Sequence, residues 1–398
     1  MAAKVFFLMD AFSSDYLSEE DTPFLFNCAN EGEFTKRITN GFGFCERAEI
    51  FTGISSIDSN YISAIGYCPD RSPYKKLSLF LKLISFVDKC IPISVFRKIL
   101  RRLLALLIYR NKHALNPYQI PYQMLKYFAL TEDYNDSSEM HALRHESIFD
   151  IALINSKKIH QNSFTGLNKK NNGTDDNRLA VVLDECSNDY SLYLIYISTM
   201  DACGHKFGPK SLQVKQALKE LDTKLQRFVS DFEKKLPEST YVFLGDHGMT
   251  TINDRIDIKS ILMQMEKNTK LRIHKDYIYF LDSTMLRVWV LNKNINDEIE
   301  IYLESDPVLN GNGIFYSKLP EYKPNRELGD IVWCANSGIL VSPDFFHTSN
   351  DNLKGMHGYL NADEGGTGMC IKYGNVKKKV YEERELHCVF DDLVDSVN

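Results

Sequence analysis

Aspartate and histidine side chains recur in four short segments of the chain, each of which follows an apolar run or contains glycine. They are Asp10 in LMDAF, Asp201 and His205 in YISTMDACGHKFGP, Asp246 and His247 in FLGDHGMT, and His357 in KGMHGYLN. Taken singly, such residues have ordinary structural roles, as helix caps or as hydrogen-bonded core histidines. Together, Asp and His without Cys form the oxygen and nitrogen ligand set that suits Zn²⁺ or Mn²⁺. Two such ions about 4 Å apart activate a nucleophile and hold a phosphoryl or sulfuryl oxygen.

The elements that must position these residues follow from the apolar runs. Strands are expected at 4–9, 179–183, 191–198, 240–245 and 277–281, and the clearest helical periodicity spans 211–236. Strands that alternate with long helices indicate an α/β fold with a mostly parallel, covered sheet. Functional residues of such sheets gather beyond the carboxyl ends of the strands. Asp10, Asp201 and Asp246 each follow such an end.

Length and composition limit the classes of protein that the chain can form. Its 398 residues suffice for one large α/β domain with insertions or for two ordinary domains. An apolar fraction of 44% and a charged fraction of 25% are those of a globular protein and exclude wholesale disorder. The formal net charge is −6, and no Lys/Arg run is interleaved with aromatic residues. Nucleic acid is therefore not expected as a partner.

The first residues and the cysteines both bear on location. MAAKVFFLMDAF has one Lys and a short apolar run before Asp10, too short for the core of a signal peptide, and is expected to form the first strand. The nine cysteines are scattered, odd in number and without CxxC pairs. Reduced thiols in a cytoplasmic protein fit this pattern better than a disulfide framework does.

Residues 71–112 differ from the rest of the chain. They contain eleven Lys or Arg residues and one acidic residue, Asp88, and the basic residues interrupt the apolar ones too often for a transmembrane span. We expect a basic helical insert or cap within residues 69–140. Its amphipathic segment either lies peripherally on an anionic membrane and guides a lipid-linked or polyanionic substrate, or packs its apolar face on the core.

The order and spacing of the motifs resemble those of the alkaline phosphatase superfamily, in its nucleotide pyrophosphatase/phosphodiesterase-like branch. The resemblance rests on an Asp after the first strand, DxxGHxxGP, GDHGM and a final HG loop. It implies one alkaline-phosphatase-like α/β sandwich over residues 1–398, around a mixed, mainly parallel sheet. It also implies two divalent ions, with Zn²⁺ favoured over Mn²⁺. One ion would be held by Asp10, Asp246 and His247, and the other by Asp201, His205 and His357.

The family's nucleophile position is occupied by glycine in this chain. The stretch GFGFCERAEIFTG ends in Thr52 and Gly53, and counting back ten residues from Gly53 reaches Gly43, where related phosphodiesterases carry Thr or Ser. Either Cys45 supplies a thiolate nucleophile, or a metal-bound hydroxide attacks directly, or the site binds without turnover. Otherwise Cys45 is a small buried hydrophobic residue. Arg47 offers a bidentate fork to a phosphate oxygen, or forms a surface salt bridge.

We therefore expect a two-metal hydrolase or transferase of phosphoric esters, most simply a phosphodiesterase. Its substrate is a phosphorylated small molecule or a lipid-linked or glycan ester, because the asparagine that contacts the phosphoryl group in nucleotide-cleaving relatives falls on Ala64 here. The alternative is a metal-bound but catalytically silent protein that recognises phosphorylated or lipid-linked ligands. A sulfatase, phosphomonoesterase or mutase of the same superfamily is a further alternative.

Overall fold

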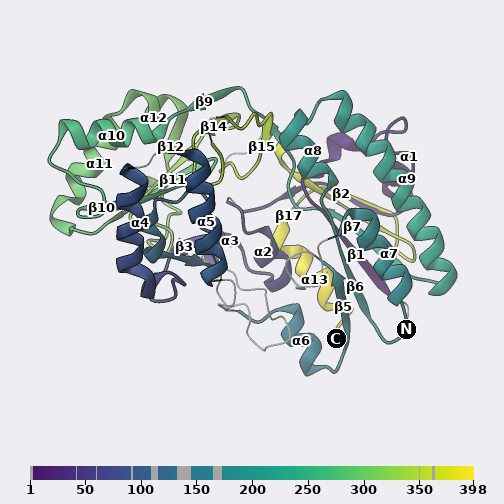
Figure 1. The fold of residues 1–398 in the computed structure, drawn as a ribbon. Helices are drawn as coiled ribbons and strands as arrows, with labels where there is room; N and C mark the ends of the chain where they lie inside the picture. Colours follow the sequence, from purple (N-terminus) through teal and green to yellow (C-terminus); the bar gives the residue numbers. More distant parts are fainter. Residues whose placement is uncertain are drawn as a thin grey trace. The chain divides into compact units, whose positions relative to one another are not determined.

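The computed structural model divides the chain into two compact units, which are described separately (Figure 1). It describes residues 3–41, 43–59, 61–90, 93–108, 115–131, 145–164, 173–348, 350–360 and 364–398. The first unit comprises Met1–Ser59, Asp133–Ile252 and Leu353–Asn398, and the second comprises Asn60–Glu132 and Asn253–Asn352. Whether residues 1–398 fold as the single domain expected from the sequence stays a prediction.

The first unit is built on a seven-stranded sheet with the strand order β17-β2-β16-β7-β1-β6-β5. The strands are β1 (Lys4–Met9), β2 (Glu33–Thr39), β5 (Ile159–Ser163), β6 (Leu192–Ile197), β7 (Thr240–Gly245), β16 (Gly368–Tyr373) and β17 (Lys379–Glu385). All neighbours pair in parallel except β16, which is antiparallel to β2 and to β7. The mixed, mainly parallel sheet expected from the sequence is confirmed.

The register of the three central strands explains why the site residues meet. Met9, the last residue of β1, pairs with Ile197 of β6 and with Gly245 of β7. The three strands therefore end at the same level, and the residues that follow them leave the sheet side by side. This is the edge at which ligands bind in open α/β sheets.

Helices cover both faces of this sheet (Figure 1). One face carries α1 (Pro23–Glu31), α7 (Asp175–Glu185), α8 (Thr199–Phe207) and α9 (Leu212–Lys235), and the other carries α2 (Glu46–Thr52), α6 (Ile148–Ile154) and α13 (Val389–Val394). Strand β1 shows how the two cores form, because Val5, Phe7 and Met9 enter one apolar cluster while Phe6 and Leu8 enter the other. The predicted α/β sandwich is therefore confirmed.

Most predicted elements of this unit are confirmed and one is wrong. Strands at 4–9, 191–198 and 240–245 and the helix at 211–236 are present. Residues 179–183 belong instead to helix α7. Thr174 caps that helix by accepting a hydrogen bond from the Asn177 backbone, and its buried positions recur with helical spacing. Five consecutive apolar residues could not distinguish a strand from a buried helical turn.

The second unit contains a four-stranded antiparallel sheet with the order β10-β11-β13-β12. Its strands are β10 (Tyr277–Leu281), β11 (Met285–Val290), β12 (Gly313–Phe315) and β13 (Ile331–Ala335), and its longer helices are α4 (Ser78–Cys90), α5 (Ser94–Ile108), α10 (Ile258–Asn268), α11 (Asn296–Ser305) and α12 (Pro307–Asn312). The predicted strand at 277–281 is thus present, but in a separate antiparallel sheet. This arrangement could not be read from the alternation of strands and helices alone.

Short elements complete the two units. They are α3 (Ser56–Ser59) and the strand pairs β3 (Ile65–Tyr67) with β4 (Phe128–Leu130), β8 (Thr250–Thr251) with β15 (Gly355–Met356), and β9 (Asp254–Ile256) with β14 (Ile339–Val341). Among the described residues, the helical part of the predicted insert 69–140 consists of α4, α5 and two 3₁₀ turns, at Lys75–Leu77 and Tyr122–Tyr127. Residues 91–92, 109–114 and 132–140 of that insert lie outside the described residues. Among the described helices, none is long and apolar enough to cross a membrane.

Candidate metal centre

The six predicted ligands gather at one edge of the first unit's sheet. Asp10 follows β1, Asp201 and His205 lie on α8 after β6, Asp246 and His247 follow β7, and His357 follows β15. Strands β1, β6 and β7 end where the chain leaves the seven-stranded sheet, and β15 belongs to a separate pair with β8, the strand that follows β7 in the sequence. The side chains therefore converge from four segments that are distant in sequence. They form two groups of three.

The first group consists of Asp10, Asp246 and His247. One ligand atom from each lies within 4.8 Å of the others. The Nε2 atom of His247 is 3.2 Å from Oδ1 of Asp10 and 3.7 Å from Oδ1 of Asp246. The Nδ1 atom of His247 lies 2.8 Å from the carbonyl oxygen of Gly248, which can only accept a hydrogen bond. Nδ1 therefore carries a proton, and Nε2 faces the carboxylates.

The second group consists of Asp201, His205 and His357, again with one ligand atom each within 4.8 Å of the others. Asp201 and His205 share one face of α8, as their spacing predicts, with 3.0 Å between Oδ1 and Nε2. The Nδ1 atom of His205 lies 2.9 Å from the carbonyl oxygen of Gly355. This contact orients His205 in the way that Gly248 orients His247. The Nε2 atom of His357 is 3.7 Å from Oδ1 of Asp201.

A third group joins the first two and was missed by the sequence analysis. Glu46, His247 and His357 also bring ligand atoms within 4.8 Å of one another. The rings of His247 and His357 stack with centroids 3.9 Å apart and planes at 9°. Glu46 is the first residue of α2 and is buried. The sequence analysis predicted catalytic roles only for its neighbours Cys45 and Arg47, because the motif of the resembling family has no recognised ligand at the position of Glu46.

Burial and mutual charge shift the pKa values of this cluster strongly. Burial raises the pKa of Asp246 to about 8 and that of Glu46 to about 7, although the charge of His247 opposes both shifts. Burial alone would lower the pKa of His247, but Asp246, Asp10 and Glu46 hold it well above its usual value. The pKa of His357 is well below its usual value, because burial and the charges of His247 and of His205 disfavour protonation. These shifts identify Asp246 and Glu46 as carboxylates with too little positive charge around them. Asp10 differs, because burial alone would raise its pKa but the hydrogen bond and charge of His247 lower it.

Polar atoms without partners show that the residues fit a cation. Nδ1 of His357 is buried without a hydrogen-bond partner among the described residues. Oδ1 of Asp201 is also buried and accepts no hydrogen bond there, because the neighbouring Nε2 atom of His205, at 3.0 Å, carries a lone pair when the proton is on Nδ1. A buried polar atom without a partner costs free energy, whereas coordination of a cation would satisfy the carboxylate oxygen. Carboxylate oxygens and imidazole nitrogens are also the donors that Zn²⁺ and Mn²⁺ accept. The two predicted groups therefore fit two divalent ions.

Tyr196 and a backbone amide support the first group from outside. The hydroxyl of Tyr196, at the end of β6, donates to Oδ2 of Asp10, and the backbone N–H of Ala11 donates to Oδ1 of Asp246 at 3.3 Å. These contacts leave the Oδ1 atom of Asp10 directed at His247. Hydrogen bonds of this kind orient metal ligands and tune their affinity.

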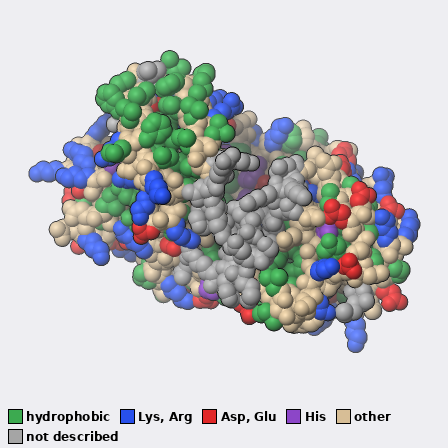
Figure 2. All heavy atoms as spheres, turned by 60° about the horizontal axis from the view of Figure 1, so that its bottom comes forward, with side chains coloured by type: hydrophobic (Ala, Val, Ile, Leu, Met, Phe, Trp, Pro, Cys, Tyr) green, Lys and Arg blue, Asp and Glu red, His purple; other side chains and the backbone are tan. Residues whose placement is uncertain are grey.

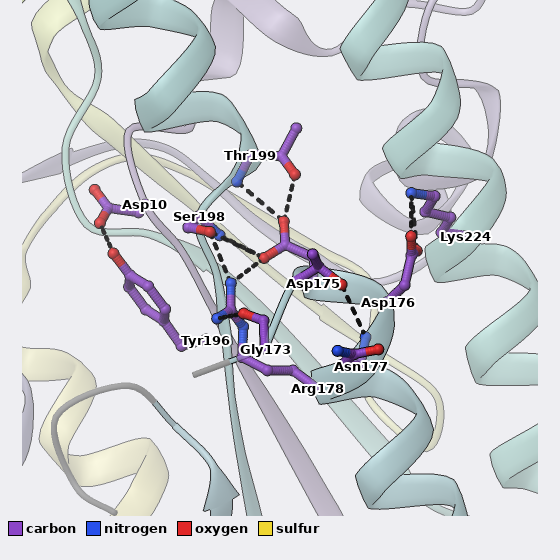
Figure 3. A network of polar contacts seen from close by, with 11 residues as sticks. Asp10, Gly173, Asp175, Asp176, Asn177, Arg178, Tyr196, Ser198, Thr199 and Lys224 are labelled. Carbon is purple, nitrogen blue, oxygen red and sulfur yellow. Dashed lines mark hydrogen bonds and ion pairs between the residues drawn. The ribbon is translucent and has the colours of Figure 1, made fainter. Parts of the chain in front are cut away.

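A polar network anchors the start of α8, the helix that carries Asp201 (Figure 3). Asp175 accepts hydrogen bonds from the backbone N–H groups of Ser198 and Thr199, both at 3.0 Å. Arg178 forms an ion pair with Asp175 and donates to Oγ of Ser198 at 2.7 Å. The network holds the junction between β6 and α8 in one geometry and thereby positions Asp201.

The turn that carries the predicted nucleophile position lies against the His357 loop. A Cβ atom on Gly358 would be 3.0 Å from the carbonyl oxygen of Gly43, and the Phe44 ring packs edge-on against His357 with centroids 5.4 Å apart. Gly43 has a φ of 111°, a conformation that strains residues with a side chain. The family's nucleophile position is thus close to the cluster but has no side chain.

The two predicted catalytic side chains differ in placement. Cys45 is buried directly before α2, and its sulfur belongs to none of the three ligand groups found among the described residues. Arg47 is half-buried, with its guanidinium carbon 4.8 Å from the Tyr196 ring centroid. Arg47 therefore stacks on the residue that holds Asp10. A catalytic role for either side chain stays a prediction.

Comparison with known families identifies the chain. The profile of the type I phosphodiesterase / nucleotide pyrophosphatase family matches residues 111–360, more than half of the sequence. The chain belongs to this family. This membership confirms the resemblance inferred from the motifs. It also supports the prediction that the chain is a phosphodiesterase-like hydrolase. The match includes five of the six predicted ligands, while Asp10 and the turn at 41–53 precede it.

Two curated relatives match part of the chain. Ectonucleotide pyrophosphatase/phosphodiesterase family member 7 from Mus musculus is 24% identical over 189 residues, which is 44% of this chain. Its counterpart from Rattus norvegicus is 23% identical over the same length. In both cases the match covers only 39% of the relative.

Solved structures of the family have the same fold. Human ectonucleotide pyrophosphatase/phosphodiesterase 5 superposes with a TM-score of 0.70 at 18% identity, over 100% of this chain and 95% of the human one. An inactive variant of the murine protein in complex with AMP gives a TM-score of 0.69 at 17% identity, with the same coverage. At this identity the likeness concerns the fold alone.

Proposed function

We propose that the chain is a phosphodiesterase that uses two divalent metal ions, with Zn²⁺ favoured and Mn²⁺ the alternative. The observation that carries the proposal is the pair of adjacent ligand groups at the ends of β1, β6 and β7. The first ion would be held by Asp10, Asp246 and His247, and the second by Asp201, His205 and His357. Each group has the three protein ligands that catalytic zinc sites use, which leaves room for a substrate oxygen.

Two divalent ions in these groups would supply positive charge to the phosphoryl oxygens and would lower the pKa of water at the site. The chain itself fixes the donors. Backbone carbonyls hold the Nδ1 protons of His205 and His247, so that both Nε2 atoms face carboxylates. Tyr196 holds one oxygen of Asp10. Arg47, stacked on Tyr196, would offer its guanidinium fork to a phosphoryl oxygen.

The attacking group in this proposal is either water or the Cys45 thiolate. Water is favoured, since Gly43 has no side chain and the Cys45 sulfur is outside the ligand groups found in the described part of the chain. The variant Cys45→Ser separates the two routes. A thiolate nucleophile requires a loss of orders of magnitude in rate, whereas attack by water leaves the rate nearly unchanged.

The substrate is proposed to be a phosphodiester larger than a nucleotide, such as a lipid-linked or glycan ester. Ala64 at the position of a phosphoryl-contacting asparagine supports this choice. The murine relative was solved with AMP, so AMP is the natural comparison compound. Competition by AMP against a generic diester substrate tests the choice, because inhibition at low concentration would favour a nucleotide substrate instead.

Hydrolysis of bis-p-nitrophenyl phosphate by the purified chain with Zn²⁺ or Mn²⁺ tests the proposed activity. Asp246→Ala should abolish turnover, since it removes a ligand of the first group. Asp231→Ala is the matched control, because the Asp231 side chain on α9 is 43% exposed and its ion pair is with Lys234 of the same helix. Turnover that survives Asp246→Ala would refute the two-metal proposal. Metal binding without any turnover would favour the silent, ligand-recognising alternative.

A second proposal concerns the partner of helices α4 and α5. Apolar side chains on both helices face solvent, and Figure 2 shows hydrophobic atoms gathered on this part of the surface. We call them the α4–α5 face, and they are Leu79, Phe80, Leu83, Phe86, Val95, Ile99, Leu103, Leu106 and Leu107. Other apolar residues of the same helices, Leu81 and Leu104 among them, are fully buried. The helices are therefore apolar on two sides, of which only one packs within the protein.

We propose that the α4–α5 face binds peripherally to an anionic membrane. Charge complementarity supports this occupant, because Lys82, Lys98 and Arg102 are exposed on the same helices, while the single acidic residue Asp88 is paired with Arg97 at 2.6 Å. A contiguous exposed apolar area of this kind marks an interaction site. Apolar contact and basic charge together favour the surface of an anionic bilayer.

Sedimentation with phosphatidylserine vesicles and with phosphatidylcholine vesicles tests this proposal. Binding should be stronger to the anionic vesicles and should weaken as salt is raised. Absence of binding to both would refute it, and a salt-independent self-association through the same face would point to a second copy of the chain instead.

We also propose that the protein is cytoplasmic. The nine cysteines are present as thiols, which supports a reducing compartment. Fractionation of cells that express the tagged chain tests it, and recovery of the chain outside the cytoplasm would refute it.

A further inference from the structure

Two glutamates on helix α2 have different surroundings although they lie one turn apart. Oε1 of Glu49 accepts hydrogen bonds from the backbone N–H groups of Gly41 at 3.0 Å and Ser56 at 3.1 Å. It thus closes the two turns that flank the helix. Glu46 has one long contact from the Asn40 amide, at 3.4 Å, and otherwise faces histidines. Glu49 is therefore explained by the fold, and Glu46 is not.

The histidines that Glu46 meets come one from each proposed metal group. Its carboxylate and ring nitrogens of His247 and His357 all lie within 4.8 Å of one another. His247 belongs to the group with Asp10 and Asp246, and His357 to the group with Asp201. The stacked rings, 3.9 Å apart, bring the two groups into contact at the point where Glu46 enters. No other acidic side chain in the described residues shares a group with a histidine from both.

We propose, on the basis of the two-metal function proposed above, that Glu46 is a seventh ligand and bridges the two ions. A carboxylate has two oxygens and can give one to each of two ions about 4 Å apart. The nucleophile side chain that would contact metal in the resembling family is absent at Gly43. Glu46, three residues later, brings an oxygen to the same cluster from the start of α2.

Charge balance supports the bridge. The two groups of three contain three carboxylates, from Asp10, Asp201 and Asp246. With Glu46 there are four carboxylates, whose negative charges equal the four positive charges of two divalent ions when the histidines are neutral. A buried centre of zero net charge is favoured over a charged one, because burial in a medium of low dielectric penalises net charge.

Metal titration of the intact chain tests the bridge without reference to activity. Zn²⁺ binding is followed by calorimetry, and Co²⁺ binding by visible absorption, which reports the number and type of ligands. Glu46→Gln should lower the affinity for the ions by at least about 10–100-fold and should change the Co²⁺ spectrum. Glu49→Gln is the matched control on the same helix and should leave both unchanged. Asp246→Ala is the reference variant, because it removes a proposed ligand of the first ion.

A second variant separates ligation from simple charge. Glu46→Asp keeps the negative charge but shortens the side chain by one methylene, so that its oxygens reach less far. A bridging ligand requires that Glu46→Asp also lose affinity and alter the Co²⁺ spectrum. If Glu46→Asp binds as the unmodified chain does while Glu46→Gln binds weakly, the role is electrostatic and the bridge is refuted.

The remaining outcomes distinguish this inference from the proposed function. If Glu46→Gln binds two Co²⁺ ions with unchanged affinity and spectrum while Asp246→Ala does not, the two-metal function stands and the bridge is refuted. If the unmodified chain binds neither ion, the proposed function and the bridge fail together. Circular dichroism of each variant establishes that a loss of binding occurs in folded protein.

Discussion

Folded proteins usually bury apolar side chains and expose charged ones. The candidate metal centre and the α4–α5 face depart from this distribution in opposite ways. The centre gathers four carboxylates, of which Asp246 and Glu46 are buried and Asp10 and Asp201 are partly buried, whereas the α4–α5 face exposes nine large apolar side chains. Buried charge and exposed apolar surface are the two departures that carry information in a folded protein. Each departure is the basis of a proposed partner: divalent cations for the carboxylates, and an anionic bilayer for the apolar face with its lysines and arginines.

The two regions also lie in different compact units of the chain. Substitutions in one should therefore leave the property of the other intact. That independence allows each region to serve as the internal control for the other.

The largest expected effect is on the centre. Asp201→Asn replaces a ligand of the second group by a neutral amide of the same shape. We expect the rate of diester hydrolysis to fall at least about 1,000-fold, which corresponds to about 4 kcal/mol of lost stabilisation of the transition state. Initial rates with saturating Zn²⁺ measure it. Binding to anionic vesicles should not change, and a parallel loss of vesicle binding would indicate misfolding.

The next effect is on the α4–α5 face. The double variant Leu83→Glu, Leu103→Glu places charge at two side chains that are 58% and 51% exposed. We expect at least about a 100-fold loss in affinity for phosphatidylserine vesicles, since each buried leucine is worth about 1.5–3 kcal/mol. Leu212→Glu, at an equally apolar position that is 80% exposed on α9, is the control and should bind normally. Equal losses in both variants would show that the face is not specific.

A smaller effect is expected at the support of the first group. Tyr196→Phe removes the hydroxyl that donates to Asp10 and keeps the ring on which Arg47 stacks. We expect a loss of about 10-fold in Zn²⁺ affinity by calorimetry. Tyr193→Phe is the control on the same strand, because the Tyr193 hydroxyl bonds only to the backbone of Ser187 among its described contacts. Unchanged affinity in Tyr196→Phe would remove Tyr196 from the centre.

The smallest effect is on stability against pH. The folded-state pKa of Asp246 is raised to about 8 and that of Glu46 to about 7. Each protonated carboxyl group therefore contributes stability that is fully present below its pKa in the unfolded state. That stability is lost as the pH rises through its pKa in the folded state. The lowered pKa of His357 opposes this loss of stability at pH values below 6.5, the ordinary pKa of histidine. Between about pH 6.5 and 8 the metal-free chain should therefore melt progressively lower, by about 2–4 °C for each kcal/mol lost. Differential scanning fluorimetry with a chelator measures it.

Added Zn²⁺ should remove this pH dependence, because the cation supplies the positive charge that the carboxylates lack. A melting temperature of the metal-free chain that rises over the same interval would contradict the assignment of the raised pKa values to the centre.

The sequence predicted which six side chains converge at the candidate centre, because these residues are tied to local patterns, while their role as metal ligands stays a prediction. Asp10 and Asp246 follow runs of buried apolar residues that could only be central strands, and Asp201 and His205 are spaced for one face of a helix. Glu46 was missed because its role depends on the stacking of His247 on His357, which joins segments distant in the sequence.

The amphipathic character of α4 and α5 was equally visible in the sequence, but the sequence did not show which apolar side of each helix is buried. Leu81 and Leu104 are buried while Leu83 and Leu103 face solvent, although all four are leucines within the same two helices. Which apolar side packs depends on the tertiary structure. The strand predicted at 179–183 failed for a related reason, since the cap at Thr174 and the packing of α7 outweighed a local run of β-favouring residues.

Diffraction from a crystal of the chain grown with Zn²⁺, recorded at the zinc absorption edge, tests the central claim most directly. Two anomalous peaks are expected, one contacted by Asp10, Asp246 and His247 and the other by Asp201, His205 and His357. The absence of both peaks from a crystal with intact side chains at these positions would contradict the two-metal centre, as would zinc bound only elsewhere.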